Sequence, residues 1–600
     1  MHLFAKHLRI QERLAWICLV VFVVSAIPTS ASQWQINPQQ LSRLREALRK
    51  LDGRYDPKEQ MLREPFHSPG YHTTLKGGFV HSTRSSLEYA VGLLDTGEDS
   101  LLPRAEAILK RVISLQDKNP ESKTYGIWPW FLEEPLEKMS PPDWNWADFC
   151  GTLLLQVALD HRDRLSPTVA KMVDESIQHA ARSIQRRNVG PDYTNIAIMG
   201  SYVTLVAAEL YGLKDIGAYA QERWRRFYLH ATSRGAFTEY NSPTYTVVAL
   251  REVGRILKHV KDAQARQQAE AVYRLAWEEI AHHFHPPTRQ WAGPHSRSYS
   301  TMVGPSLWSL LYQATDGRVN FGHNEPRLDE VRLPLPCPPD LEHYFTELTN
   351  PRQLLKTFVP GQPPVVGTTY LHPLYALGSV NRGDLWNQRR PLVAYWGSSN
   401  SVSSVRLRCL HDGYDFAATQ FFSVQRDGAV LAAVNWATDG GDRHVSLDRI
   451  KNATFRAKDI RLRFEFEGVY GRRKFRAPNA LDEPVEINVD GGLNIFLSTP
   501  YARWGNETGH WESGSDGARS WLDVVLYSGP EREINLKELE EAAAGCAVLF
   551  TTGNQRFKKV DSKTENARLS LKWCGMELSI PIKPAPITVQ QKGFTGRANN

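Results

Sequence analysis

The feature that most constrains the fold is a long series of amphipathic segments between residues 38 and 315. Apolar residues recur there at spacings of three and four, with Pro, Gly or Asn between the segments, which is the pattern of successive helices. Short links such as residues 213–214 predict antiparallel helical hairpins. Hairpins in series without a sharp repeat indicate a solenoid or an α/α toroid. The expected helices span 38–52, 82–95, 101–116, 146–161, 167–187, 195–212, 215–230, 243–260, 265–283 and 302–315.

The pattern changes after about residue 334, where several prolines interrupt the helical spacing. From residue 370 the chain alternates in short runs bounded by Gly, Asp and Asn, which favours an antiparallel β-sandwich. Residues 535–544 are the exception and resemble a short helix. The predicted class is a multidomain α+β chain, an N-terminal (α/α) toroid, or incomplete barrel of helical hairpins, followed by a C-terminal antiparallel β-sandwich. The predicted boundaries are a signal peptide at 1–31, the toroid at 32–335, a Pro-rich linker at 336–368 and the sandwich at 369–600.

The N-terminus has the layout of a secretory leader. Lys6, Arg9 and Arg13 precede an apolar run at 14–24, and small residues follow at 27–32. Eleven apolar residues are short for a membrane span, so we expect a signal peptide cleaved near Ala31. This predicts a secreted or periplasmic protein without stable membrane insertion. An uncleaved anchor is the alternative.

Composition argues against several classes of partner. A net charge of +7 over 600 residues is a mild basic excess, so nucleic acid is not an expected partner. The six cysteines are scattered and form no CxxC pair, which indicates neither a disulfide scaffold nor a thiol zinc site. No HExxH motif is present, and we expect neither a metal nor another cofactor.

Five polar, aromatic-rich stretches each precede a predicted helix of the same alternate set. They are residues 81–86, 128–151, 191–195, 235–245 and 293–300. Alternate helices of a toroid run in the same direction, so their N-termini gather at one rim. The positive ends of the helix dipoles would then favour an anionic ligand.

The segment 291–302, WAGPHSRSYSTM, carries the densest group of reactive side chains. His295, Arg297 and Tyr299 are two residues apart, so an extended backbone would point all three to one side. A nearby cation favours the phenolate form of a tyrosine, which makes Tyr299 the predicted proton-transfer residue. Tyr245 remains open for the same role. A lone histidine is more often structural than catalytic, and Asn195, Glu239 and Asn241 could equally be turn or cap residues.

Several of these motifs resemble those of a known enzyme group. Residues 83–97, 125–151, 193–202, 237–245 and 291–299 are similar to the helical domain of toroid polysaccharide lyases of the glucuronan-lyase kind. The helical-then-sandwich layout resembles the wider alginate lyase and heparinase II/III-like group. The motifs cover most of residues 80–315; beyond residue 365 the resemblance rests on layout and on residues 369–392.

The resemblance implies a secreted lyase that cleaves a uronic-acid-containing polysaccharide, glucuronan-like or alginate-like, by β-elimination. In the resembling enzymes a Tyr transfers the proton while an Asn and a His assist, which implies these roles for Tyr299, Asn195 and His295. Arg297 joins them because of its charge. An acidic polysaccharide is the expected partner. The expected substrate-binding residues are Glu239, Asn241, Tyr245, Trp130, Trp144, Asn145, Trp146, His81, Arg84, His372 and Arg382.

Two other functions are alternatives to this prediction. An inverting glycoside hydrolase would need two carboxylates, which Asp143, Asp148 and Glu239 could supply. It ranks lower because residues 291–302 contain no carboxylate. A noncatalytic glycan-binding protein could use the tryptophan-rich loop as its platform. That function would leave the His/Arg/Tyr group without a role.

Overall fold

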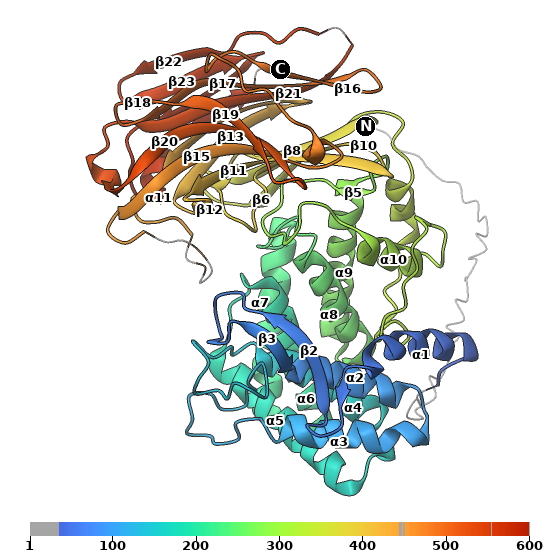
Figure 1. Ribbon diagram of the computed structural model, residues 1–600. Helices are drawn as coiled ribbons and strands as arrows, with labels where there is room; N and C mark the ends of the chain where they lie inside the picture. The colour runs from blue at the N-terminus through green and yellow to red at the C-terminus, as the bar shows by residue number, and fades with distance from the viewer. Residues whose placement is uncertain (1–34, 443, 445–446, 448–449, 554, 599–600) are drawn as a thin grey trace, which may run out of the picture. The chain divides into compact units, whose positions relative to one another are not determined.

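Helical hairpins form the N-terminal part of the chain (Figure 1). The computed structural model describes residues 35–442, 444, 447, 450–553 and 555–598, so the predicted signal peptide lies outside the described residues. α1 (Pro38–Asp52) comes first, with Asn37 as its N-cap. The hairpins pair α2 (Thr83–Asp95) with α3 (Leu102–Ile113), α4 (Trp146–Asp160) with α5 (Pro167–Arg187), α6 (Thr194–Tyr211) with α7 (Lys214–Arg234), and α8 (Tyr245–His259) with α9 (Ala263–His283).

The hairpins assemble into two layers of helices. α2, α4, α6 and α8 each contact the next of their set, and so do α3, α5, α7 and α9. Fourteen of the 18 residues of α6 are buried, against six of the 21 residues of α7. Since a helix that is apolar on nearly every side is buried, α6 belongs to an inner layer and α7 to an outer one. This arrangement confirms the predicted incomplete toroid.

The predicted helix ends agree with the structure to within a few residues, including α10 (Pro305–Ala314). A small antiparallel sheet before α2 was not expected. It consists of β1 (Tyr55–Asp56), β2 (Met61–His67) and β3 (Gly77–His81). Its strands are short and largely exposed, so their apolar pattern is weak. Within the described ranges, no helix combines the length and the apolar character needed to cross a membrane.

The C-terminal part is a stack of antiparallel sheets. The described strands of the first sheet follow the order β19-β20-β15-β11-β10-β8-β7-β6, with β12 beside β11. They are β6 (Arg352–Val359), β7 (Val365–His372), β8 (Tyr375–Val380), β10 (Leu392–Ser398), β11 (Ser401–His411), β12 (Tyr414–Asp415), β15 (Thr454–Gly468), β19 (His510–Ser515) and β20 (Ser520–Asn535).

The second sheet has the order β16-β17-β21-β14-β13-β9, with β18 beside β17. It comprises β9 (Arg382–Asp384), β13 (Thr419–Arg426), β14 (Ala429–Trp436), β16 (Val485–Val489), β17 (Leu493–Trp504), β18 (Glu507–Thr508) and β21 (Ala542–Thr552). Trp396 and Phe464 of the first sheet share a buried core with Val434 and Val548 of the second. This pair of sheets is the predicted sandwich.

A third layer lies on the other face of the second sheet and was not expected. Phe422 and Leu431 pack there against Leu571 and Trp573. The layer is a four-stranded sheet of β22 (Asp561–Glu565), β23 (Arg568–Trp573), β24 (Met576–Pro581) and β25 (Thr595–Ala598).

Two local predictions differ from the structure. Residues 535–544 do not form the expected helix, because only Leu536–Glu538 make a 3₁₀ turn between β20 and β21. Ala542, Ala543 and Ala544 are all buried in β21, and a strand buried on both faces lacks the alternation that identifies it. β6 lies within residues 336–368, where a linker was expected, and pairs with β7. The domain boundaries as a set stay a prediction.

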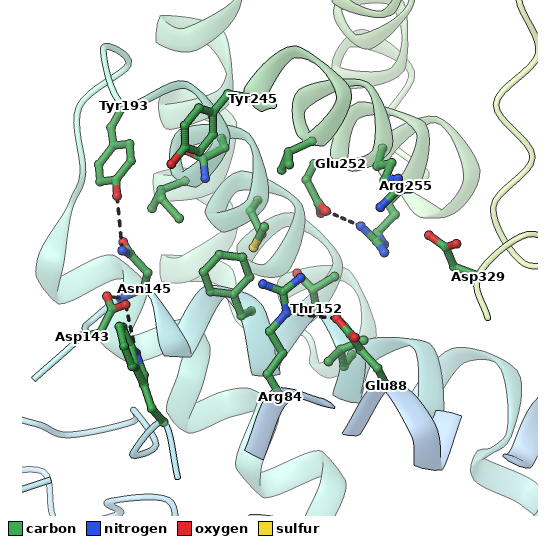
Figure 2. A pocket seen from close by; sticks show the side chains of 18 of the residues that line it. Arg84, Glu88, Asp143, Asn145, Thr152, Tyr193, Tyr245, Glu252, Arg255 and Asp329 are labelled. Atoms are coloured by element: carbon green, nitrogen blue, oxygen red, sulfur yellow. Dashed lines mark hydrogen bonds and ion pairs between the residues drawn. The ribbon is translucent and has the colours of Figure 1, made fainter. Parts of the chain in front are cut away.

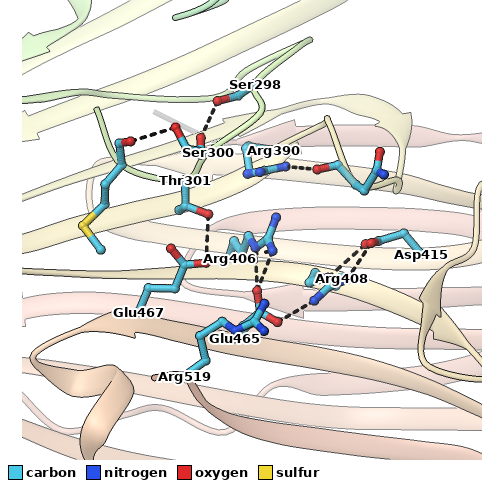
Figure 3. Close-up of polar contacts among 12 residues, drawn as sticks. Ser298, Ser300, Thr301, Arg390, Arg406, Arg408, Asp415, Glu465, Glu467 and Arg519 are labelled. Carbon is cyan, nitrogen blue, oxygen red and sulfur yellow. Dashed lines mark hydrogen bonds and ion pairs between the residues drawn. The ribbon is translucent and has the colours of Figure 1, made fainter. Parts of the chain in front are cut away.

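The segment 291–302 lies against the outer face of the first sheet. His295 and Arg390 exchange backbone hydrogen bonds of 3.0 and 2.9 Å. A Cβ added at Gly378 would lie 1.9 Å from the Gly293 carbonyl oxygen, so only glycine allows this approach. Thr301 Oγ1 donates to Glu467 Oε1 at 3.3 Å (Figure 3). The sheet therefore fixes the backbone that carries Arg297 and Tyr299.

Buried ion pairs stiffen the sheet beneath this segment (Figure 3). Arg406 Nε lies 2.9 Å from Glu465 Oε1, and Arg408 Nη1 lies 2.5 Å from the other oxygen of the same carboxylate. Arg408 also donates to Asp415 at 2.6 and 2.9 Å. Arg406 and Arg408 therefore each pair with a buried carboxylate, which offsets the cost of burying their charges.

Candidate active site

A cavity of about 560 Å³ opens among the inner helices. All five polar stretches that precede alternate helices contribute to its lining, which confirms the expected convergence. Figure 2 shows Arg84, Asn145, Tyr193 and Tyr245 from four of them. The lining residues from these stretches are Arg84, Trp130, Asp143, Asn145, Phe149, Tyr193, Asn195, Tyr245, Arg297 and Tyr299.

Three of them form a chain of hydrogen bonds at the cavity. Arg297 Nη2 donates to the Tyr245 hydroxyl oxygen at 3.1 Å, and that oxygen lies 2.9 Å from the hydroxyl of Tyr299. A guanidinium can only donate, so the Tyr245 proton is available to the Tyr299 oxygen. Tyr299 is 57% exposed and ends the chain on the open side.

The position of Arg297 is fixed from several directions. Its Nη1 donates to Glu239 Oε1 at 3.1 Å, and its Nε donates to Gln388 Oε1 at 2.9 Å. The guanidinium carbon lies 4.8 Å from the ring centre of Tyr245 and 5.4 Å from that of Trp386. Three of the five guanidinium N–H groups are therefore used, which leaves two for a ligand.

Burial sets the protonation of the groups around Arg297. Burial raises the pKa of Glu239 to about 7, against the opposing effect of the Arg297 charge. Burial also raises the pKa of the Tyr245 phenol, again against Arg297. Tyr245 therefore stays protonated at neutral pH and can donate to Tyr299.

Two asparagines at the starts of inner helices also line the cavity. Asn195 is the second residue of α6, and its buried Oδ1 has no hydrogen-bond partner among the described residues. Asn145 precedes α4; its Oδ1 accepts from Arg187 Nη1 at 2.6 Å and its Nδ2 donates to Tyr193 at 3.3 Å (Figure 2). Asn145 is thus held in place, whereas the Asn195 amide is open to an additional partner.

Trp130 and Arg84 complete the predicted residues that reach the cavity. Trp130 Nε1 donates to Asp143 Oδ2 at 3.2 Å, and Arg84 Nε donates to Glu88 Oε1 at 3.0 Å. Trp146 lies behind Trp130, with ring centres 5.2 Å apart. Trp146 supports the aromatic wall of the cavity and is not itself one of the residues that line it.

His295, predicted to be catalytic, is buried and does not line the cavity. Its Nδ1 lies 2.8 Å from the Asn241 carbonyl oxygen, and its Nε2 lies 3.4 Å from the Tyr395 hydroxyl. Burial lowers its pKa to about 3, so the ring is neutral. Asn241 is also buried, and its Nδ2 donates to the carbonyls of Ala292 and Pro294 at 2.9 and 2.8 Å. Both side chains hold the segment that presents Arg297 and Tyr299.

The other predicted binding residues lie elsewhere. Glu239 contacts the cavity only through Arg297. Trp144 lines a separate surface pocket and donates to the Lys123 carbonyl. His81 lies between Glu133, at 2.5 Å, and Asp56, at 3.2 Å.

His372 and Arg382, on β7 and β9, are also outside the cavity lining. His372 Nδ1 accepts the backbone N–H of Leu374 at 3.1 Å. The β-sheet part contributes His444 to the lining instead, and burial lowers the pKa of His444 to about 4.

A group of charged residues deeper in the cavity was not found from the sequence. Its members are Glu88, Arg251, Glu252, Arg255, Arg327, Asp329 and Arg332. Glu88, Glu252, Arg255 and Asp329 are labelled in Figure 2. Burial acts to raise the pKa of Asp329, but Arg327, Arg251 and Arg255 hold it well below its usual range. Arg251 and Arg255 are four residues apart and lie on one face of an inner helix, but this spacing does not by itself show that the face lines a cavity.

Residues 41–313 match a family described as a Domain of unknown function (DUF8769). No curated protein sequence matches.

Among solved structures, a heparinase III is 11% identical, with 92% of this chain and 91% of that chain covered and a TM-score of 0.39. The Streptomyces coelicolor A3 chondroitin AC lyase in complex with chondroitin sulphate is 10% identical, with 92% and 86% covered and a TM-score of 0.46. A chondroitinase AC lyase is 8% identical, with 92% and 89% covered and a TM-score of 0.41. At TM-scores below 0.5, these likenesses carry no argument about activity.

Proposed function

We propose that the protein is a polysaccharide lyase that cleaves a uronic-acid-containing polymer, glucuronan-like or alginate-like, by β-elimination. The observation that carries the proposal is the hydrogen-bonded chain from Arg297 through Tyr245 to Tyr299 at the cavity. The predicted leader supports action outside the cytoplasm.

The first requirement of the reaction is to neutralise the C6 carboxylate of the uronate. The proton on the adjacent C5 is barely acidic while that carboxylate keeps its full charge, so donors must stabilise the charge that develops. Arg297 has two unused N–H groups for this purpose. Asn195 lines the same cavity, and its amide Nδ2 is a donor that can reach the carboxylate there.

The second requirement is a base for the C5 proton, and Tyr299 fits it best. When Tyr299 is a phenolate, Tyr245 donates to its oxygen, and the charge of Arg297 is transmitted through that bond. Tyr299 takes the proton from C5, a double bond forms between C4 and C5, and the C4–oxygen bond breaks. The phenol then returns its proton to the departing glycosidic oxygen, which restores the phenolate.

His295 has a positioning role in this scheme. Its ring is buried, neutral and bonded to the backbone of Asn241. Asn241 in turn holds the carbonyls on either side of Gly293. The pair therefore acts on the reaction through the backbone that carries Arg297 and Tyr299.

The three carboxylates named for the hydrolase alternative, Asp143, Asp148 and Glu239, do not form a pair that lines the cavity. Of the three candidates, only Asp143 lines the cavity, and it already accepts from Trp130 and from the Asn145 backbone. Glu239 is engaged with Arg297, and Asp148 is buried with its pKa raised by burial to about 7.

The test is incubation of the mature protein with glucuronan, alginate, hyaluronan and heparan-type polymers. We expect ultraviolet-absorbing unsaturated ends from at least one polymer. New reducing ends without that absorbance would identify a hydrolase and overturn the proposal. Binding without chain shortening would identify a noncatalytic glycan-binding protein.

A further inference from the structure

The lower part of the cavity is charged, and most of its arginines are already neutralised. Arg84 Nε lies 3.0 Å from Glu88 Oε1, and Arg327 Nε lies 2.9 Å from Asp329 Oδ1. Arg255 pairs with Glu252, and Arg332 pairs with Asp95. Each of these four guanidinium groups therefore has a carboxylate of its own.

Arg251 is different from these four. It lines the cavity, yet the described part of the chain supplies its guanidinium with neither a hydrogen bond nor an ion pair, and its Nε is buried. Burial lowers the pKa of Arg251, against the opposing effect of Asp329. A buried cation without a partner costs free energy unless an anion joins it. Among the arginines of this charged group, Arg251 therefore carries the positive charge that no carboxylate of the described residues pairs with. We call this charged part of the lining the cavity floor.

The position of Arg251 relates it to the reacting groups. It follows Tyr245 by six residues on α8, which places it roughly 9 Å deeper along the helix axis at 1.5 Å per residue. An oligosaccharide whose reacting sugar lies at Tyr299 would extend toward this depth. The planar guanidinium fork binds carboxylate and sulfate groups with two parallel hydrogen bonds.

We propose that Arg251 forms an anion-binding subsite on the cavity floor. It takes a second acidic group, a carboxylate or a sulfate, from the same oligosaccharide that reacts at Tyr299. The inference rests on the proposed function and narrows its substrate class. The substrate is a chain that bears acidic groups on more than one sugar.

The experiment measures binding in a Tyr299→Phe background, so that turnover does not interfere. Isothermal titration uses three probes: glucuronic acid, a tetrasaccharide of glucuronan and a tetrasaccharide of chondroitin sulfate. Arg251→Gln should weaken binding of a tetrasaccharide by about tenfold to hundredfold, the loss of one charge-assisted bidentate contact, and leave the monosaccharide unchanged. Arg251→Lys should recover part of the loss. Arg225→Gln, at an exposed pair with Glu222 on α7, is the matched control and should bind as the parent does.

The two tetrasaccharides separate the sources of the anion. A loss with the glucuronan probe assigns the contact to a carboxylate, and a loss confined to the sulfated probe assigns it to a sulfate. Unchanged affinity for both overturns the subsite, as does a failure of both to bind when Arg251 is present. An equal loss for the monosaccharide also overturns it, since the contact would then belong to the reacting sugar.

A second readout excludes a purely structural role. Because Arg251 has no partner within the described chain, Arg251→Gln should leave the unfolding temperature unchanged or raise it. A marked fall would mean that the guanidinium stabilises the fold, and would contradict the proposal. Binding that depends on Arg251 in a protein that forms no unsaturated ends would keep the subsite and reject the lyase.

Discussion

The two ends of the cavity are built from different parts of the same helices. The upper end consists of residues at or just before helix starts, such as Asn195 and Tyr245, together with Arg297 and Tyr299 from the segment after α9. The lower end combines helix interiors, where Arg251 and Arg255 face the cavity, with the segment after α10 that carries Arg327, Asp329 and Arg332. The upper end has a connected chain of donors suited to proton transfer, and the lower end has paired charges with one unmatched arginine. The comparison assigns chemistry to the upper end and substrate binding to the lower end.

Among the variants that distinguish the two ends of the cavity, the one at Arg297 should show the largest loss of activity. Arg297→Gln removes the donor to Tyr245 and a positive charge next to the two tyrosine hydroxyls. We expect kcat/KM to fall by about 10²–10³-fold, mainly through kcat, as for the loss of a preorganised electrostatic contact. Arg251→Gln should raise KM and leave kcat within about threefold. Steady-state rates of unsaturated-end formation give both constants. If Arg297→Gln and Arg251→Gln changed kcat equally, the assignment of chemistry to the upper end and of substrate binding to the lower end would be wrong.

Replacement of His295 should affect stability and not chemistry. His295→Ala leaves the Asn241 carbonyl buried without its donor, at a cost of about 1–3 kcal/mol in the free energy of unfolding. We expect a lower urea midpoint and a kcat per folded molecule within about threefold of the wild type. A large loss of kcat with an unchanged urea midpoint would mean that His295 takes part in catalysis.

The pKa of Glu239 predicts a pH dependence at the upper end. Glu239 is protonated below about pH 7 and ionised above it, where its negative charge offsets that of Arg297. KM for the uronate polymer should therefore rise by up to about tenfold as the pH passes from 6 to 8. Glu239→Gln should show a flat KM over this range. A wild-type profile without the step would contradict the role given to this pair.

The same residue predicts a stability effect of known sign. The pKa of Glu239 is higher in the folded chain than its usual value, so protonation favours the folded state. This stability is complete below the usual carboxyl pKa and is lost as the pH rises through about 7. Glu239→Gln should remove that loss, which thermal unfolding below the usual carboxyl pKa, at about pH 4, and again at about pH 8, would measure.

The smallest effect is expected at the aromatic wall. Trp130→Ala removes a cavity-lining ring and should raise KM by about threefold, within the range for one aromatic contact. Trp144→Ala alters a ring outside this cavity and should leave KM unchanged. Equal changes in KM for Trp130→Ala and Trp144→Ala would mean that the sugar chain also contacts Trp144, outside this cavity.

The residues of the upper end could be predicted from the sequence because the patterns that mark helix starts are local. Helix starts follow from apolar spacing and caps, and the direction of alternate helices then brings Asn195, Tyr245 and Tyr299 together. The lower end could not be found in this way. Arg251 and Arg255 lie on an inner helix, and spacing alone does not distinguish a face toward a cavity from a face toward a partner helix.

The alternate spacing of His295, Arg297 and Tyr299 also could not show which of these side chains reaches the cavity. An extended segment does point alternate side chains to one side, but the first sheet covers the N-terminal end of this one. His295 therefore lies in the interior with Tyr395, while Arg297 and Tyr299 reach the cavity. The third β-layer could not be predicted, because apolar alternation identifies a strand but does not give the sheet against which it packs.

The most direct test of the central claim is the rate of unsaturated-end formation by Tyr299→Phe on the polymer that the wild type cleaves best. The variant loses only the oxygen that accepts the C5 proton. The account predicts a fall of about 10³-fold or more, with oligosaccharide affinity within twofold of the wild type. Tyr501→Phe, on β17 in the sandwich, should keep the wild-type rate. Full activity of Tyr299→Phe would contradict the account and transfer the role to Tyr245.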